Sequence, residues 1–190
     1  YSQNSKYDRI FFETAQVLIA SNSKKALQNT NYLYRISRNN SERIKSCMLK
    51  ATLLRQYGLR NEAIAALKRA DSLSLTETNY TLQARINGFM STVYREYEIY
   101  SLGKIHLQKA VAVSRKIKDK NEMYKFQGNL SQEIAYYEMY DSNYSKAINS
   151  LKSGNKLFEK AGTSIDQNFQ TAVNDELIAK CEMKISLTDK

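Results

Sequence analysis

Few side chains in this sequence have the type and spacing that catalysis or metal binding requires. His106 is the only histidine, and a metal site needs several ligands of this kind. Cys47 and Cys181 stand far apart, and neither belongs to a CxxC or CxxxH pattern. The glycine-rich phosphate loops GxGxxG and GxxxxGKS/T do not occur. We therefore expect a binding protein rather than an enzyme, with no catalytic residue, no metal, no cofactor and two unpaired thiols.

Tyrosine is the unusual residue, with 14 copies. On a helix, Tyr94, Tyr97 and Tyr100 share one face, and Tyr136 and Tyr140 share another. Tyrosine fills volume between packed helices while its hydroxyl stays hydrated, and it is also a favoured anchor of interaction surfaces. The sequence therefore leaves both interpretations open, packing between helices and recognition of a partner.

The chain is basic, with 29 Lys and Arg against 19 Asp and Glu and a net charge of +10. These basic residues are spread through every segment, whereas a nucleic-acid footprint is usually clustered on one face. We therefore expect a lysine-rich surface and no direct nucleic-acid binding by this fragment. No apolar stretch approaches the roughly 20 residues that a membrane-spanning helix needs, so we expect no membrane insertion within it.

The shortage of helix-breaking residues predicts an all-α fold. The chain has no proline and six glycines, and these are the residues least favoured inside helices. A sandwich or barrel would need turn residues roughly every 8–12 positions. We expect no strand and nine helices, at 6–20, 24–38, 42–57, 61–75, 79–100, 103–118, 121–141, 144–161 and 166–185.

A repeated pattern of small residues arranges these helices in pairs. Each copy has a small residue in the first helix, another twelve positions later, a leucine four after that and a small residue three further on. In the second helix this spacing marks one face, where small side chains let two backbones approach closely. The copies are Ala51, Ala63, Leu67 and Ala70; Ser91, Gly103, Leu107 and Ala110; Ala135, Ala147, Leu151 and Gly154; and a degenerate set of Thr14, Ala26, Thr30 and Leu33. A half copy begins at Ala179. The sequence thus predicts one repeat domain over 1–190, with pairs at 6–38, 42–75, 79–118 and 121–161 and a closing helix at 166–185.

Local signals support these boundaries. A capping side chain followed three residues later by Glu or Gln marks the start of a helix. Such signals occur at Ser74-x-x-Glu77, Asp119-x-x-Glu122 and Ser164-x-x-Gln167. Gly58 and the segment 141–143 mark turns within pairs.

On these residues the chain resembles the tetratricopeptide (TPR) repeat family. The matching positions are Ala51, Ala63, Ile64, Leu67 and Ala70; Tyr94, Tyr100 and Ala110; and Ala135, Tyr144, Ala147 and Ile148. The copies are spaced 37 to 44 residues apart, more than the family's usual spacing of about 34, and the family's terminal proline is absent. The resemblance implies an α-solenoid of antiparallel helix pairs in a right-handed superhelix, with protein or peptide partners.

A narrower resemblance concerns the runs 124–139 and 167–179. They look like the repeats that precede a membrane helix and an AraC-like helix-turn-helix domain in transcriptional regulators of the Bacteroidetes type. This resemblance implies a bacterial sensor or interaction segment. It leaves the compartment open between cytoplasm and periplasm, the latter if a signal peptide precedes the segment and a membrane helix follows it.

In the resembled family, first helices line the concave face of the superhelix. Taking the faces three to four residues from the leading small residues predicts a peptide- or protein-binding surface. It consists of Lys45, Met48, Thr52, Arg55, Arg85, Thr92, Arg95, Asn129, Gln132, Tyr136, Met139 and Lys180. Arginine forks suit carboxylates, so the expected ligand is an acidic or C-terminal peptide, from a partner or from another part of the same polypeptide. The alternatives are a solvated basic face, a self-associating scaffold without a ligand, and a peptide-pheromone receptor.

Overall fold

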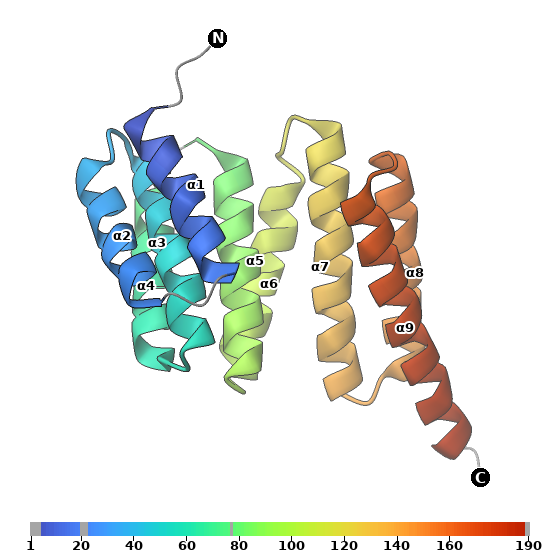
Figure 1. Ribbon diagram of the computed structural model, residues 1–190. Coiled ribbons are helices and arrows are strands. Elements are labelled where there is room, and N and C mark those ends of the chain that lie inside the picture. Colours follow the sequence, from blue (N-terminus) through green and yellow to red (C-terminus); the bar gives the residue numbers. More distant parts are fainter. Residues whose placement is uncertain (1–4, 20–22, 77, 189–190) are drawn as a thin grey trace. The chain divides into compact units, whose positions relative to one another are not determined.

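The computed structural model describes residues 5–19, 23–76 and 78–188, and within these ranges every regular element is an α-helix (Figure 1). The all-α prediction is therefore confirmed. The helices are α1 (Lys6–Ile19), α2 (Ser23–Ile36), α3 (Asn40–Gln56), α4 (Arg60–Ser74), α5 (Tyr80–Glu96), α6 (Tyr100–Ser114), α7 (Lys120–Tyr140), α8 (Tyr144–Lys160) and α9 (Ile165–Thr188).

The chain forms two compact units, Tyr1–Ile86 and Asn87–Lys190, with the boundary inside α5. We call them unit 1 and unit 2. In unit 1, α1 packs on α2, and α3 packs on α2 and α4. In unit 2, α7 packs on α6 and α8, and α9 packs on α8 (Figure 1).

The predicted pattern of small residues lies at the helix contacts in both units. In unit 1 the side chains of Thr14, Ala26, Ala51 and Ala63 are fully buried. In unit 2 Ser91, Ala135 and Ala147 are fully buried, and Gly103 and Gly154 are buried as well. Backbones packed this closely leave no room for larger side chains, which explains why the pattern is so regular in sequence.

Gly103 is smaller than the pattern requires, for a local reason. The Tyr137 hydroxyl donates to the Ser91 backbone oxygen at 3.0 Å, and a Cβ at Gly103 would collide with that hydroxyl. A glycine is needed here because a tyrosine from α7 occupies the space that the methyl of Ala63 or Ala147 fills in the other copies.

The half copy at Ala179 is only partly right. Ala179 is exposed, and α9 instead buries Asn174, Leu177 and Cys181. Leu177 and Cys181 pack in one cluster with Ala135, Ala147 and Leu151. In the other copies the leading small residue is covered by the second helix of its own pair. Within the described residues no second helix follows α9, so Ala179 meets solvent.

The turn after the first helix of a pair has the same hydrogen bonds in three copies. Leu59 N donates to Leu54 O, Ile99 N to Tyr94 O and Asn143 N to Glu138 O, at 2.9, 2.8 and 2.7 Å. One residue before each donor, the backbone is left-handed, with φ of 70° at Gly58, 62° at Glu98 and 59° at Ser142. This is the Schellman arrangement, in which glycine carries no steric cost.

The second of these turns corrects two predictions. Because Glu98 gave no glycine or asparagine signal, the sequence predicted a helix over 79–100, whereas α5 ends at Glu96 and α6 begins at Tyr100. Tyr94, Tyr97 and Tyr100 therefore do not share one helical face. Tyr94 is buried and stacks on His106, with ring centroids 5.5 Å apart.

Two of the three capping signals are confirmed. Glu122 N donates to Asp119 Oδ1 at 2.8 Å, and Gln167 N donates to Ser164 Oγ at 3.3 Å. The signal at Ser74 is wrong, because Ser74 ends α4 and its hydroxyl donates to the Asp71 backbone oxygen; Glu77 lies outside the described residues. Asn79 caps α5 instead, accepting from Leu82 N at 3.0 Å.

Candidate functional site

Unit 2 contains a cleft of about 560 Å³. It lies where the C-terminal ends of α5 and α7 approach the first residues of α6 and α8 and the last third of α9. Its lining is aromatic, thioether and cationic, without a carboxylate. The lining residues are Arg95, Tyr100, Tyr136, Met139, Tyr140, Tyr144, Lys180, Met183 and Lys184.

The aromatic wall of the cleft is held together by ring contacts. Tyr100 stacks on Tyr140, with ring centroids 3.7 Å apart, and meets Tyr137 edge-on at 6.5 Å. Stacked and edge-on aromatic pairs contribute about 0.5–1.5 kcal/mol beyond burial. Tyr140 nevertheless stays 56% exposed, so the stack offers a fixed aromatic surface to a ligand.

Arg95 is fixed by two neighbours from α7. Its Nε and Nη2 donate to the two carboxylate oxygens of Glu133 at 2.9 and 3.1 Å. Its Cζ lies 4.3 Å from the centroid of the Tyr136 ring. Burial alone would lower the pKa of Arg95, but the hydrogen bond and charge of Glu133 outweigh it and raise that pKa. Arg95 thus positions Tyr136 and neutralises Glu133 rather than offering an unengaged fork.

The wall of the cleft that α9 forms is exposed. Lys180 Nζ pairs with Glu176 Oε1 at 2.5 Å, and both side chains are more than half exposed. Met183 is 57% exposed. An exposed pair of this kind is weak, so a ligand carboxylate competes readily with Glu176 for Lys180.

Four of the predicted surface residues come together in this cleft: Arg95, Tyr136, Met139 and Lys180. Two others hold helices to one another. Thr92 Oγ1 donates to Glu133 Oε2 at 3.1 Å, and Gln132 Nε2 donates to Gln170 Oε1 at 3.2 Å.

The remaining six lie outside the cleft. In unit 1, Lys45 on α3 and Arg85 on α5 are exposed, while Met48, Thr52 and Arg55 on α3 are half-buried. Thr52 Oγ1 donates to the Met48 backbone oxygen at 3.0 Å. In unit 2, Asn129 is exposed on α7. Their role in binding stays a prediction.

Five lining residues are absent from the predicted surface, although Tyr100 and Tyr140 were among the tyrosines for which the sequence left recognition of a partner open. Tyr100, Tyr140 and Tyr144 stand at helix ends next to the left-handed turns, and Met183 and Lys184 follow Lys180 by less than one turn and one turn. The recurrence of tyrosine beside each turn was a usable signal. It was hidden because the turn at Glu98 was not recognised.

The histidine and the two cysteines considered above as candidates for chemistry are buried between packed helices. His106 is buried, and its Nδ1 lies 2.8 Å from Asn87 Oδ1. Cys47 and Cys181 are both buried free thiols, and burial raises the pKa of each. Over residues 5–19, 23–76 and 78–188, no three metal-ligating side chains gather. In that same part of the chain, no helix has the length and apolarity needed to cross a bilayer.

Comparison with models of known families gives no match, and neither does comparison with curated protein sequences. Solved structures do match. A Podosopora anserina putative kinesin light chain with TPR-like repeats aligns over 100% of both chains, with a TM-score of 0.61 and 13% identity. BtubC (BKLC) from P. vanneervenii aligns over 88% of this chain and 72% of its own, with a TM-score of 0.54 and 8% identity.

A third structure, the MamA RS-1 ArsTM double mutant, aligns over 96% of this chain and 98% of its own, with a TM-score of 0.50 and 14% identity. Likeness at such low identity concerns the fold. The chain therefore has a TPR-like helical-repeat fold, as the spacing of its small residues predicts.

Proposed function

We propose that this chain is a protein-interaction module that binds a peptide segment in the unit 2 cleft. The observation that carries the proposal is the convergence of four predicted surface residues, Arg95, Tyr136, Met139 and Lys180, with a stacked tyrosine pair on one cleft. Function in a repeat fold depends on the site rather than on the fold itself, and this cleft combines rigid aromatic anchors with cations.

The chemistry of the lining selects an extended segment with an apolar or aromatic side chain and a carboxylate. The Tyr100–Tyr140 stack and Met183 provide apolar surface that is still exposed in the free chain. Lys180 provides the cation for a ligand carboxylate. Tyrosine carries much of the binding energy in such surfaces because it is large and loses little conformational freedom.

The test is selection of random 12-residue peptides against the whole chain, followed by calorimetry on the enriched peptides. Tyr140→Ala and Met183→Ala should weaken binding about tenfold each, which corresponds to about 1.4 kcal/mol. Asn121→Ala, exposed on α7 outside both the cleft and the predicted surface, is the matched control and should bind like the parent. Peptides that bind all four proteins equally would place the site elsewhere.

Self-association is a separate outcome of the same variants. If the parent sediments as a concentration-dependent dimer and Tyr140→Ala does not, the cleft binds a second copy rather than a foreign peptide.

We further propose that the module is the sensory or interaction segment of a transcriptional regulator. The support is the resemblance of the runs 124–139 and 167–179 to the repeats of AraC-like regulators. The full reading frame tests it. A membrane helix and a helix-turn-helix domain downstream are expected, and a different downstream domain would contradict the proposal.

A further inference from the structure

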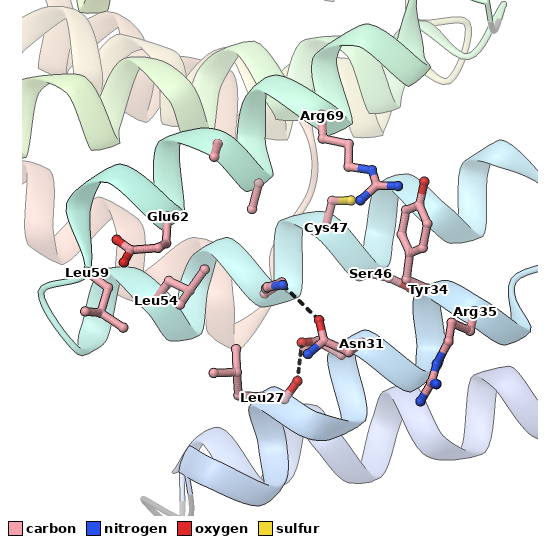
Figure 2. Close-up of a pocket in the computed structure, with 14 residues that line it drawn as sticks. Leu27, Asn31, Tyr34, Arg35, Ser46, Cys47, Leu54, Leu59, Glu62 and Arg69 are labelled. Carbon is pink, nitrogen blue, oxygen red and sulfur yellow. Dashed lines mark hydrogen bonds between the residues drawn. The ribbon is translucent and has the colours of Figure 1, made fainter.

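Unit 1 has a larger groove on the opposite face of α3 from the predicted surface. Its volume is about 970 Å³, and it is lined by α2, α3 and α4 (Figure 2). The lining residues of α3 are Ser46, Cys47, Lys50 and Leu54, half a helical turn from Lys45, Met48, Thr52 and Arg55.

The floor of this groove is apolar. Cys47 and Leu54 of α3 are buried at the base, and Ala66 of α4 is nearly so. Leu27 of α2 and Leu59 at the start of α4 complete the apolar surface, and Leu59 remains 42% exposed. Apolar side chains of a partner would lose contact with water here.

The rim of the groove is cationic, and two of its cations, Lys50 and Arg69, contact residues of α2. Lys50 Nζ donates to Asn31 Oδ1 at 2.8 Å. The Arg69 guanidinium lies 4.1 Å from the Tyr34 ring centroid, next to Cys47 in Figure 2. Arg35 also lines the groove, and Glu62 is the one carboxylate of the lining.

The charges of Arg69 and Lys50 act on the buried thiol of Cys47. Burial raises the pKa of its thiol, and the charges of Arg69 and Lys50 partly offset this. The positive field therefore reaches the floor from both α4 and α3, where a partner's carboxylate would be only partly hydrated and its ion pair correspondingly stronger.

Unit 2 has the corresponding groove, which serves as an internal comparison. It measures about 310 Å³ and is lined by Leu107, Gln108, Val111, Ala112, Arg115 and Ile134. If Ala26 is aligned with Gly103 and Ala51 with Ala135, three polar groove residues of unit 1 have apolar counterparts. Val111 replaces Tyr34, Ala112 replaces Arg35 and Ile134 replaces Lys50.

We propose that the unit 1 groove is a second protein-interaction site, which binds an acidic segment carrying apolar side chains. The fold does not require a basic lining at these positions, because the corresponding groove in unit 2 is built without Tyr34, Arg35 and Lys50. Three cations against one carboxylate make the groove complementary to a partner of negative charge. The apolar floor and Glu62 favour a polypeptide over a nucleic acid. The phosphates of a nucleic acid would gain nothing from apolar surface and would be repelled by the Glu62 carboxylate.

The experiment selects 12-residue peptides against the Tyr140→Ala variant of the whole chain, so that failure of the unit 2 proposal does not affect it. The enriched peptides should combine Asp or Glu with Leu, Ile or Phe. The triple change Tyr34→Val, Arg35→Ala and Lys50→Ile installs the unit 2 residues and should weaken binding at least about tenfold, since charge-assisted contacts are lost. Arg115→Ala, which removes a cation from the unit 2 groove, is the control for loss of positive charge outside unit 1 and should leave binding unchanged.

A second measurement locates the bound peptide without any substitution in unit 1. Alkylation by N-ethylmaleimide, followed by mass spectrometry, should slow at Cys47 when peptide is present and stay constant at Cys181. Circular dichroism melting checks that the triple variant is folded. No acidic enrichment, equal binding by the triple variant, or unchanged alkylation of Cys47 would overturn the proposal. So would a 20-nucleotide DNA or RNA that binds with the same residue dependence.

Discussion

Each unit contains a cluster of the same four kinds of side chain, Tyr, Ser, Glu and Arg. The arginine of the cluster is more exposed in unit 1 than in unit 2. In unit 1 the Tyr7 hydroxyl donates to the Glu42 backbone oxygen at 2.6 Å and lies 2.9 Å from Ser46 Oγ. The Glu42 carboxylate pairs with Arg38; the Glu42 side chain is only 10% exposed, whereas that of Arg38 is 65% exposed. In unit 2 the matching ion pair, Arg95 with Glu133, has an arginine only 20% exposed.

The partners of the two carboxylates differ as well. Glu42 also accepts from the Arg38 backbone N–H at 2.8 Å, a donor that no side-chain substitution removes. Besides Arg95, Glu133 accepts from the hydroxyls of Thr92 at 3.1 Å and Ser91 at 3.4 Å. The unit 1 ion pair therefore stabilises the N-terminal end of α3, whereas the unit 2 ion pair connects α5 to α7. The same residue types stabilise a helix end in one place and a helix contact in the other.

The largest effect expected from this comparison is that of Arg95→Ala. It leaves the buried Glu133 carboxylate with neutral partners only. Breaking a buried pair costs about 3–5 kcal/mol, and because Arg95 is partly exposed we expect a loss of about 2 kcal/mol in the free energy of unfolding. Urea denaturation measures it. Arg38→Ala is the control and should lower stability far less, so equal losses would show that burial does not distinguish the pairs.

An intermediate effect is expected at alkaline pH from Tyr7. Burial raises its pKa from 10.0 to about 12, with a smaller opposing contribution from the Ser46 hydroxyl. Below pH 10 the tyrosine is protonated in both states, so its contribution is constant. Between pH 10 and 12 the unfolded chain releases a proton that the folded chain retains, and stability falls.

Tyr7→Phe isolates this effect from the titration of lysines. The parent should lose on the order of 1–2 kcal/mol more than Tyr7→Phe between pH 10 and pH 12, as followed by urea titrations at each pH. Tyr137→Phe provides the unit 2 counterpart, since burial raises the pKa of Tyr137 too. Parallel pH profiles for the parent and Tyr7→Phe would refute the assignment.

The smallest effect concerns the left-handed turns, where unit 1 has Gly58 and unit 2 has Glu98 and Ser142. A residue with a Cβ costs about 1 kcal/mol in this conformation. Glu98→Gly and Ser142→Gly should therefore stabilise the chain by up to about 1 kcal/mol each, less the entropy that glycine gains in the unfolded state. Gly58→Ala should destabilise the chain. A Cβ at Gly58 would meet no atom within 4 Å, so the cost arises from the φ of 70° alone. A neutral Gly58→Ala would contradict this account.

Most of the fold was predictable because the packing of paired helices demands small residues at fixed positions. Ala63 and Ala147 had to be small for the backbones to approach, and this requirement can be read from the sequence. The turn at Glu98 was not predictable in the same way, since its left-handed backbone follows from the tertiary contacts of α5 and α6 rather than from a local preference. Asn39 was missed although its signal was present. It accepts from Glu42 N at 2.9 Å, in the same pattern as Asp119.

The candidate site was predictable only in part. The helical period placed Tyr136 and Met139 on one face, and the resemblance to repeat proteins, in which first helices line one surface, added Lys180; all three line the unit 2 cleft. The helical period did not show that Arg95 is engaged by Glu133, since a contact between α5 and α7 depends on how the helices pack. The unit 1 groove was not predicted at all. Its lining draws on α2, α3 and α4, and no single helical face contains it.

Gly103 and Tyr137 set a limit on how this chain can be remodelled by recombination. Helix pairs of a repeat protein are often treated as interchangeable modules that duplicate or move within the array. A duplicated pair carrying Ala63 or Ala147 at the place of Gly103 would meet the Tyr137 hydroxyl of the following helix. The third and fourth pairs are therefore a matched set, and an ancestral exchange or a consensus design at this junction has to change both positions together.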